Sequence, residues 1–260
     1  MNIITLTSDW GNCSHYPGIV KGVILNLCPD AKIIDISHDI PPFDIWKASF
    51  IMKNCYKHYP KGTIHIIGIN SEYTEESPHI CVEHDGHFFI GSDNGIFSLI
   101  FDNKPEKVFE INIKNETDVV SFSGRDVFAP AACHILQGKS PEELGKRKEL
   151  IKQLFHPQPA TEDNIIRGTV IFIDTYDNII TNVTQQIFDE TGKGRDFNIA
   201  FRKYDEIKKL HKTYNEVPEG EMLAFFDSSG LLEIAINKGK ASSLLGLKIN
   251  DPIRILFENR

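Results

Sequence analysis

The strongest constraint on the fold is a change of hydrophobic pattern about halfway along the chain. In the first half, apolar runs of strand length alternate with segments whose apolar residues recur at helical spacing. After Gly138 the chain becomes polar, and from Ile165 on it consists mainly of short β runs separated by turns. We therefore predict an α/β domain over 1–150, a linker over 151–164 and a smaller all-β domain over 165–260.

The first half has the order strand, helix, strand, helix, strand. Because parallel neighbours must be joined by a crossover, this order predicts a largely parallel sheet with right-handed connections. Two shorter runs on either side of Asp85-Gly86 are typical of a hairpin. The predicted strands are 3–7, 32–37, 62–69, 79–83 and 88–90, and the predicted helices are 18–27, 43–56 and 127–136.

The second half contains no helical period of comparable strength. The polar segment 139–164, with three prolines, is interpreted as a helix followed by the linker. The β runs beyond it are divided by glycine-containing turns, which favours a small antiparallel barrel or sandwich, and we expect a barrel-like domain. The predicted strands are 170–173, 179–183, 198–201, 223–226, 231–236 and 253–257.

The amino-acid composition argues against several classes of binding partner. A net charge of −8 over 260 residues argues against nucleic acid, which is bound through clustered cations. No apolar run reaches the roughly 18 residues that cross a bilayer, so no membrane partner is expected. The five cysteines show no paired metal-ligand spacing, which favours free thiols in a cytoplasmic protein and predicts no metal site.

Polar residues end the predicted parallel strands. Asp9 follows the first strand, His38 the second and Asn70 the third, and ligands of open α/β sheets bind at this edge. A carboxylate such as Asp9 can accept hydrogen bonds from both hydroxyls of a ribose, although an N-cap of the following helix is an equal alternative. We interpret His38 as structural. In the second half, Asp174–Asn178 and Ser228–Gly230 taken alone are typical of turns.

Several motifs, spread over nearly the whole chain, follow one another in the same order as in one enzyme family. They include Thr7-Ser8-Asp9-Trp10-Gly11, Asp35-Ile36-Ser37-His38-Asp39-Ile40-Pro41-Pro42, Asp93-Asn94-Gly95, Ser123-Gly124-Arg125-Asp126, Asp174-Thr175-Tyr176-Asp177-Asn178 and the segment 232–245. In these motifs the sequence resembles the S-adenosyl-L-methionine hydroxide adenosyltransferases, relatives of fluorinating and chlorinating enzymes. The resemblance implies attack on the 5′ carbon of S-adenosyl-L-methionine without a cofactor. It also implies a homotrimer that binds the adenosyl group between the N-domain of one subunit and the C-domain of its neighbour.

The resemblance assigns ligand-binding roles to matching positions. It implies that Asp9 holds the ribose, that Phe43 and Tyr73 line the sugar and sulfonium pocket, and that Gly124 belongs to the same site. In the second half, it implies that Tyr176 packs against the adenine, that Asn178 and Ser228 hold the amino and carboxylate ends of methionine, and that Asn237 and Lys238 offer main-chain groups to the adenine edge.

Three positions depart from the family pattern. Asn70, Ser77 and Ser123 stand where the resemblance expects the hydrolytic Asp, Arg and His. Asn and Ser side chains can orient a water molecule, but they cannot take its proton near neutral pH. The resemblance then implies weak transfer of the adenosyl group to water or, less readily, to halide. The alternatives are a non-catalytic adenosyl- or nucleoside-binding trimer and a purely structural trimer.

Overall fold

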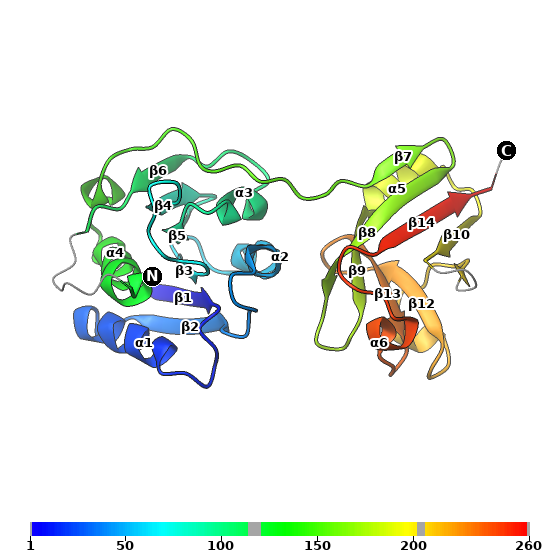
Figure 1. Ribbon diagram of the computed structural model, residues 1–260, viewed down its shortest axis with the longest axis horizontal. Coiled ribbons are helices and arrows are strands. Elements are labelled where there is room, and N and C mark those ends of the chain that lie inside the picture. Colours follow the sequence, from blue (N-terminus) through cyan, green and yellow to red (C-terminus); the bar gives the residue numbers. More distant parts are fainter. Residues whose placement is uncertain (1, 114–120, 202–205, 259–260) are drawn as a thin grey trace. The chain divides into compact units, whose positions relative to one another are not determined.

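The computed structural model describes residues 2–113, 121–201 and 206–258. It divides the chain into two compact units, Met1–Phe155 and His156–Arg260, which Figure 1 draws in blue to green and in yellow-green to red. The first unit combines strands and helices, and the second consists mainly of strands. Each unit has its own hydrophobic core.

The first unit is built on a six-stranded sheet with the order β2-β1-β3-β5-β4-β6. The pairs β1–β2, β1–β3 and β3–β5 are parallel, whereas β4 is antiparallel to both β5 and β6. The largely parallel sheet predicted from the sequence is therefore confirmed. The strands are β1 (Ile3–Ser8), β2 (Lys32–Ser37), β3 (Ile64–Gly68), β4 (His79–His84), β5 (His87–Ser92) and β6 (Lys107–Glu110).

Helices cover both faces of this sheet because its strands are apolar on both sides. Neighbouring residues of β3 enter different cores: Ile66 packs with α1 (Tyr16–Leu27) and α4 (Ala129–Leu136). Ile67 packs with α2 (Ile45–Cys55) and α3 (Ile96–Ile100). Figure 1 shows the same arrangement, with α1 and α4 together on one side and α2 and α3 on the other. This double cover leaves the carboxyl ends of the parallel strands as the open edge.

The helix predicted at the start of segment 139–164 is wrong. Only a single 3-10 turn forms there, at Pro141–Leu144, and the chain beyond it runs without helix to β7 (Ala160–Glu162). This extended stretch is attached to the first unit through Asp93, whose carboxylate binds Lys148 Nζ at 2.6 Å and the Lys152 N–H at 2.8 Å. Hydrogen bonds to a buried carboxylate replace those of a helix. The strand β6 was also not predicted from the sequence.

The second unit is an antiparallel sheet with the order β11-β10-β14-β8-β9-β13-β12, to which β7 adds beside β8. The predicted antiparallel, barrel-like domain is confirmed. Alternate residues of β13, such as Leu232 and Ile234, enter the core, so Glu233 lies on the opposite face of the strand. Besides β7, the strands are β8 (Ile165–Ile173), β9 (Ile179–Thr184), β10 (Phe197–Ala200), β11 (Glu206–Ile207), β12 (Met222–Phe226), β13 (Leu231–Ile236) and β14 (Pro252–Phe257), and the helices are α5 (Gln185–Gly192) and α6 (Ala241–Leu245).

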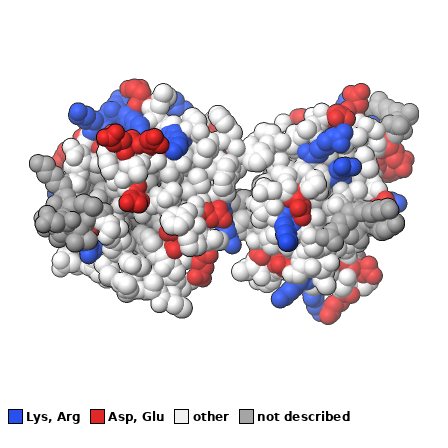
Figure 2. Space-filling view, in the orientation of Figure 1, with Lys and Arg blue, Asp and Glu red and all other residues white. Residues whose placement is uncertain are grey.

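The surface charge of both units is mixed. On the face in Figure 2, cationic and anionic side chains are interspersed rather than gathered into one basic area. This is the pattern of an ordinary solvated surface. Within the three described ranges, the structure has no helix with the length and apolar character needed to cross a membrane.

Candidate ligand site at the sheet edge and in the β unit

Asp9 is held at the open edge of the sheet by two backbone N–H groups. Its Oδ2 accepts the N–H of Phe43 at 2.9 Å and that of Asn70 at 3.4 Å. Phe43 and Asn70 both have left-handed backbones, with φ of 67° and 44°, a conformation that costs side-chain-bearing residues about 1 kcal/mol or more. Both bonds use Oδ2, which leaves the lone pairs of Oδ1 for a ligand. The alternative role as an N-cap is wrong, because α1 begins at Tyr16 after His15.

The indole of Trp10 fixes the spacing of two neighbouring segments. It lies so close to Gly68, at the end of β3, and to Gly124 that a Cβ at either glycine would overlap the ring. Phe122 meets the indole edge-on at 5.6 Å between centroids, and His38 stacks on it at 6.2 Å. Trp10 was not predicted as a site residue, because its role depends on two glycines far away in the sequence.

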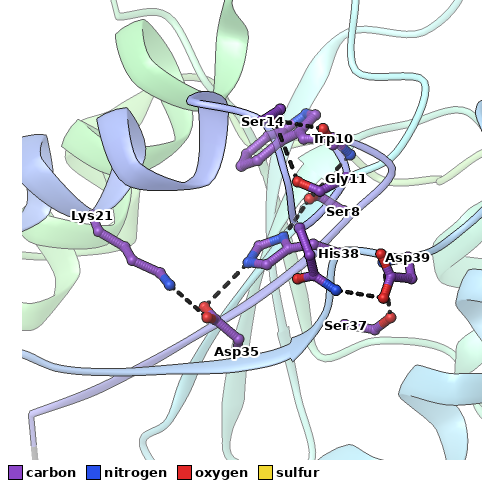
Figure 3. A network of polar contacts seen from close by, with 10 residues as sticks. Ser8, Trp10, Gly11, Ser14, Lys21, Asp35, Ser37, His38 and Asp39 are labelled. Atoms are coloured by element: carbon purple, nitrogen blue, oxygen red, sulfur yellow. Dashed lines mark hydrogen bonds and ion pairs between the residues drawn. The ribbon is translucent and has the colours of Figure 1, made fainter.

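The buried side chain of His38 takes part in a polar network that Figure 3 draws. Its Nδ1 shares a 2.6 Å hydrogen bond with Ser8 Oγ, and its Nε2 lies 3.1 Å from Asp35 Oδ1. Burial acts to raise the pKa of Asp35, but the hydrogen bonds from Lys21 and His38 outweigh it and hold that pKa below its ordinary value. His38 therefore fastens the ends of β1 and β2 to each other, in keeping with the structural role predicted for it.

Ser123 and Gly124 begin an unusual helical turn. Residues Gly124–Phe128 form a π-helical turn that leads directly into α4, and such turns are frequent at functional sites. Ser123 is 5% exposed. Arg125 binds the carboxylate of Asp126 through Nε and NH2 at 2.6 and 2.8 Å, so this cation is already paired.

The three departed positions lie on two segments of the first unit, the loop between β3 and β4 and the start of the turn before α4. Asn70 lies two residues beyond Gly68, and its carbonyl accepts a hydrogen bond from Asn94 Nδ2 at 3.3 Å. Ser123 precedes Gly124, so both positions are next to segments that contact Trp10. The contacts of Ser77 are local to a turn, in which its N–H donates to Thr74 Oγ1 at 3.0 Å.

His79 anchors the loop that carries Ser77 and Tyr73. Its Nε2 lies 3.0 Å from the Ser71 carbonyl, which can only accept, so this nitrogen carries the proton. Its ring meets Tyr73 at 5.4 Å and Phe128 of the π-helical turn at 4.9 Å, both edge-on. Burial lowers the pKa of His79, partly opposed by the bond to Ser71, and keeps the imidazole neutral at physiological pH. His79 was not predicted from the sequence either.

The second unit contains a pocket of about 700 Å³. This volume is in the range that binds small molecules of nucleoside size. Four of the predicted ligand residues line it, namely Tyr176, Asn178, Asn237 and Lys238, and Ser228 does not. Tyr176 is 77% exposed, and Phe43 and Tyr73 of the first unit are 70% and 52% exposed, so all three aromatic rings are open to a ligand.

Two residues that line this pocket, Asn178 and Tyr214, belong to a chain of polar groups. Asn178 Nδ2 donates to Asp174 Oδ2 at 3.1 Å and to Tyr214 Oη at 3.2 Å, and Tyr214 Oη donates to Glu233 Oε1 at 2.7 Å. Burial, with smaller contributions from Asp174 and Asp227, raises the pKa of Glu233 to about 7 despite the bond from Tyr214. Burial and Glu233 also raise the pKa of Tyr214. Tyr214 and Glu233 were not predicted as site residues.

Nothing in this site resembles a metal centre. Across the residues that the structure describes, no three His, Cys, Asp or Glu side chains gather where they could hold an ion. The groups available for binding are a carboxylate that can accept hydrogen bonds from hydroxyls, exposed aromatic rings, and amide or hydroxyl groups. Each of the two units thus carries groups of the kind that bind small polar aromatic molecules.

Comparison with known proteins identifies the family. Residues 4–145 match the model of the SAM hydroxide adenosyltransferase N-terminal domain, and residues 168–254 match that of the C-terminal domain. The chain belongs to the SAM hydroxide adenosyltransferase family. The resemblance inferred from the sequence motifs is confirmed.

Similar proteins cover the chain almost completely. An (R)-S-adenosyl-L-methionine hydrolase of Methanocaldococcus jannaschii is 30% identical, with 99% of this chain and 97% of the relative aligned. A fluorinase of Actinopolyspora mzabensis is 20% identical, over 97% and 96% of the two chains. Among solved structures, an uncharacterized conserved protein from Thermotoga maritima is 31% identical with a TM-score of 0.89, covering 98% of this chain and 99% of its own.

Proposed function

We propose that this protein transfers the 5′-adenosyl group of S-adenosyl-L-methionine to water, which yields adenosine and L-methionine. The observation that carries the proposal is the Asp9 carboxylate, oriented by two N–H groups at the ligand-binding edge of the sheet. Support also comes from the pocket that contains Tyr176 and Asn178, and from the relatives named as hydrolases of this compound.

The reaction needs little acid–base assistance. The oxygen of water attacks the 5′ carbon in line with the sulfonium sulfur, the carbon–sulfur bond breaks, and its electron pair neutralises the sulfur as methionine leaves. The attacking water loses one proton to solvent or to a nearby base. Because the leaving group is already cationic, alignment and exclusion of bulk water supply most of the acceleration.

In this proposal the reaction proceeds without a general base, but more slowly than it would with one. Asn70 and Ser123 would orient the water through hydrogen bonds, while Ser77 would take the place of a cation. Phe43 and Tyr73 would enclose the sugar and the sulfonium, and Gly124 would allow close approach. Tyr176, Asn178, Ser228, Asn237 and Lys238 would hold the rest of the ligand.

Water is favoured over halide as the nucleophile. The loop between β3 and β4 carries the exposed side chains of Glu72, Glu75 and Glu76, and their negative charge disfavours an anion.

The proposed assembly is a homotrimer in which one subunit supplies Asp9 and its neighbour supplies the pocket of Tyr176. This is supported by the distribution of the ligand residues over both units. The proposed location is the cytoplasm, in keeping with five free cysteines. Sedimentation at micromolar concentration tests the assembly, and a stable monomer would rule out a site shared by subunits.

Incubation with S-adenosyl-L-methionine in buffers with and without chloride tests the function. Chromatography should show adenosine and methionine in equal amounts in both buffers. 5′-Chloroadenosine in the chloride buffer would instead assign halide as the nucleophile. Binding by calorimetry without any product would assign a non-catalytic adenosyl-binding protein.

A further inference from the structure

We propose that Glu233 and Tyr214 set the hydrogen-bonding polarity of the pocket at Asn178, so that the pocket selects ligands presenting an amino or ammonium donor there. Glu233 and Tyr214 would thus be positioning residues, and Asn178 the group that meets the ligand. The inference rests on the proposed function only for the identity of the ligand, since the polar chain belongs to the protein itself.

The amide of Asn178 has one orientation. Both hydrogens of its Nδ2 are used inside the protein, one by Asp174 Oδ2 at 3.1 Å and the other by Tyr214 Oη at 3.2 Å. An ionised carboxylate only accepts hydrogen bonds, so Asp174 requires the nitrogen on its side. Asn178 Oδ1 is then the side-chain atom that remains for a ligand, and it is an acceptor.

Tyr214 links Glu233 to Asn178 through two hydrogen bonds of its hydroxyl group. Its hydroxyl donates its single proton to Glu233 Oε1 at 2.7 Å and is therefore an acceptor toward Asn178. The ring is held by Phe225 of β12, which meets it edge-on at 5.0 Å. Ionised Glu233 thus fixes the direction of the Tyr214 hydroxyl, while Asp174 fixes that of the Asn178 amide.

Glu233 is suited to this role because it is buried and no cation among the described residues acts on it. It lies on the outer face of β13, 5% exposed, and the charged groups that act on it are Asp174, before β9, and Asp227, in the turn between β12 and β13. With Tyr214, these are the titratable groups that face it. Its pKa of about 7 means that the chain changes state within the physiological range.

Protonation of Glu233 weakens the selection. The neutral acid no longer offers a charged acceptor, so the Tyr214 hydroxyl loses its strong partner and the Asn178 amide loses one of its two restraints. An amino donor then binds more weakly. A ligand with a carbonyl at the same place meets Asn178 Oδ1 acceptor to acceptor at high pH, and this penalty shrinks at low pH.

Two parts of an adenosyl sulfonium ligand carry such a donor, the amino group of adenine and the α-ammonium of methionine. Calorimetry with adenosine and inosine isolates the first, because inosine replaces the amino group by a carbonyl. Calorimetry with S-adenosyl-L-methionine and its analogue that lacks only the α-amino group isolates the second. One of these two ligand pairs differs at the group that binds Asn178. For that pair, the ratio of the affinity of the ligand with the donor to that of the ligand without it should fall about 3–10-fold in Tyr214→Phe, the worth of one hydrogen bond. Unchanged preferences in both pairs would overturn the proposal.

The conservative variant Glu233→Gln separates positioning from packing. The glutamine oxygen still accepts from Tyr214 but does not titrate, so affinity should resemble that of the wild type at pH 8 and stay constant down to pH 5.5. The wild type should lose about 3–10-fold over the same interval. Glu206→Gln, an exposed ion-pair partner of Lys208 in the same unit, is the matched control and should keep the wild-type profile. A wild-type profile in Glu233→Gln would overturn the proposal.

A ligand-free measurement keeps this inference separate from the proposed function. In protein labelled with ¹⁵N-asparagine, the side-chain resonances of Asn178, assigned by their loss in Asn178→Ala, should shift with a midpoint near pH 7. They should not shift in Glu233→Gln. If they titrate but S-adenosyl-L-methionine does not bind, the proposed function fails and the polar chain stands. Resonances that stay constant in the wild type would refute the chain.

Discussion

The carboxylate of Asp9 accepts the backbone N–H of Phe43 at 2.9 Å, across 34 positions of sequence. The bond joins the end of β1 to the segment before α2, in which the ring of Phe43 is largely exposed. Asp9→Ala should therefore remove both the ribose acceptor and this connection. We expect affinity for S-adenosyl-L-methionine to fall about 10–100-fold, the worth of hydrogen bonds to a charged group, as measured by calorimetry.

Asp30→Ala is the matched control for this change. Asp30 is an exposed carboxylate in the turn before β2, so its removal changes the net charge equally and should leave affinity unaltered. Ligand should raise the melting temperature of the control as in the wild type, because it binds only the native state. A full thermal shift in folded Asp9→Ala would exclude Asp9 from the site.

The combined change Asn70→Asp, Ser77→Arg and Ser123→His tests whether the missing base limits the rate. A general base is worth roughly 10²–10⁴-fold, so adenosine formation should rise by a sizeable part of that range. Each single change should do less, because the new carboxylate needs its orienting cation. The rate of adenosine release at saturating substrate measures the effect.

Two results would contradict this interpretation of the three positions. Fast hydrolysis by the unmodified protein would mean that another group, such as Glu72 or Asp126, acts as the base. A triple variant that folds and binds ligand but gains no activity would mean that the loop after β3 does not correspond to that of the family. Ligand-induced thermal stabilisation is the check that the variant is folded.

Gly124→Ala should destabilise the protein by about 1–3 kcal/mol, because the new methyl group would overlap the indole of Trp10. Gly22→Ala is its counterpart within α1, where a Cβ meets nothing within 4 Å. The latter should stabilise by about 0.5–1 kcal/mol through helix propensity. Denaturant unfolding measures both, and equal stabilities would show that the indole readily moves aside.

Acid should destabilise the first unit through a buried histidine pair. His65 Nδ1 bonds Thr5 Oγ1 at 2.7 Å, its Nε2 lies 3.3 Å from His87 Nδ1, and burial followed by repulsion from His87 lowers its pKa to about 3. The unfolded chain binds this proton below pH 6.5 and the folded one only near pH 3. As the pH falls from 6.5 to about 3, the free energy of unfolding should therefore decrease, by at most about 5 kcal/mol from this group.

The variant His65→Gln should flatten this dependence even if it lowers stability overall. His58→Gln, at an exposed position of the same unit, should keep the wild-type slope. Chemical unfolding at several pH values between 4 and 8 gives the slopes. Parallel slopes for wild type and His65→Gln would show that His65 is protonated in the folded protein.

Most strands of both units could be predicted because their apolar runs are continuous or alternate clearly, whereas the short strands β7 and β11 were not predicted. The strand β6 could not, since only Val108 and Phe109 are apolar among four residues. The stretch after Leu144 was mistaken for a helix because local sequence does not show that the buried carboxylate of Asp93 holds it extended.

Within the site, Asp9 and Asn70 could be found because topology brings the carboxyl ends of parallel strands to one edge. Trp10 could not be assigned, because its role follows from missing side chains at Gly68 and Gly124. Tyr214 could not be assigned either. It bonds Asn178 from 36 positions away in the sequence, and it lies in a loop whose course no hydrophobic pattern predicts. Glu233 was not assigned for the same reason, since the alternation of strand residues does not show that Tyr214 bonds it.

The π-helical turn Gly124–Phe128 holds one more residue than an α-helical turn would, so it acts as a built-in insertion ahead of α4. Removing one residue there would turn it into an α-helical turn and re-aim the residues directly before it, while the apolar face of α4 stayed in place. The direction in which Ser123 points is thus separable from the stability of the helix behind it. A single codon lost or gained in this turn could re-aim the residue at position 123 without rebuilding the domain.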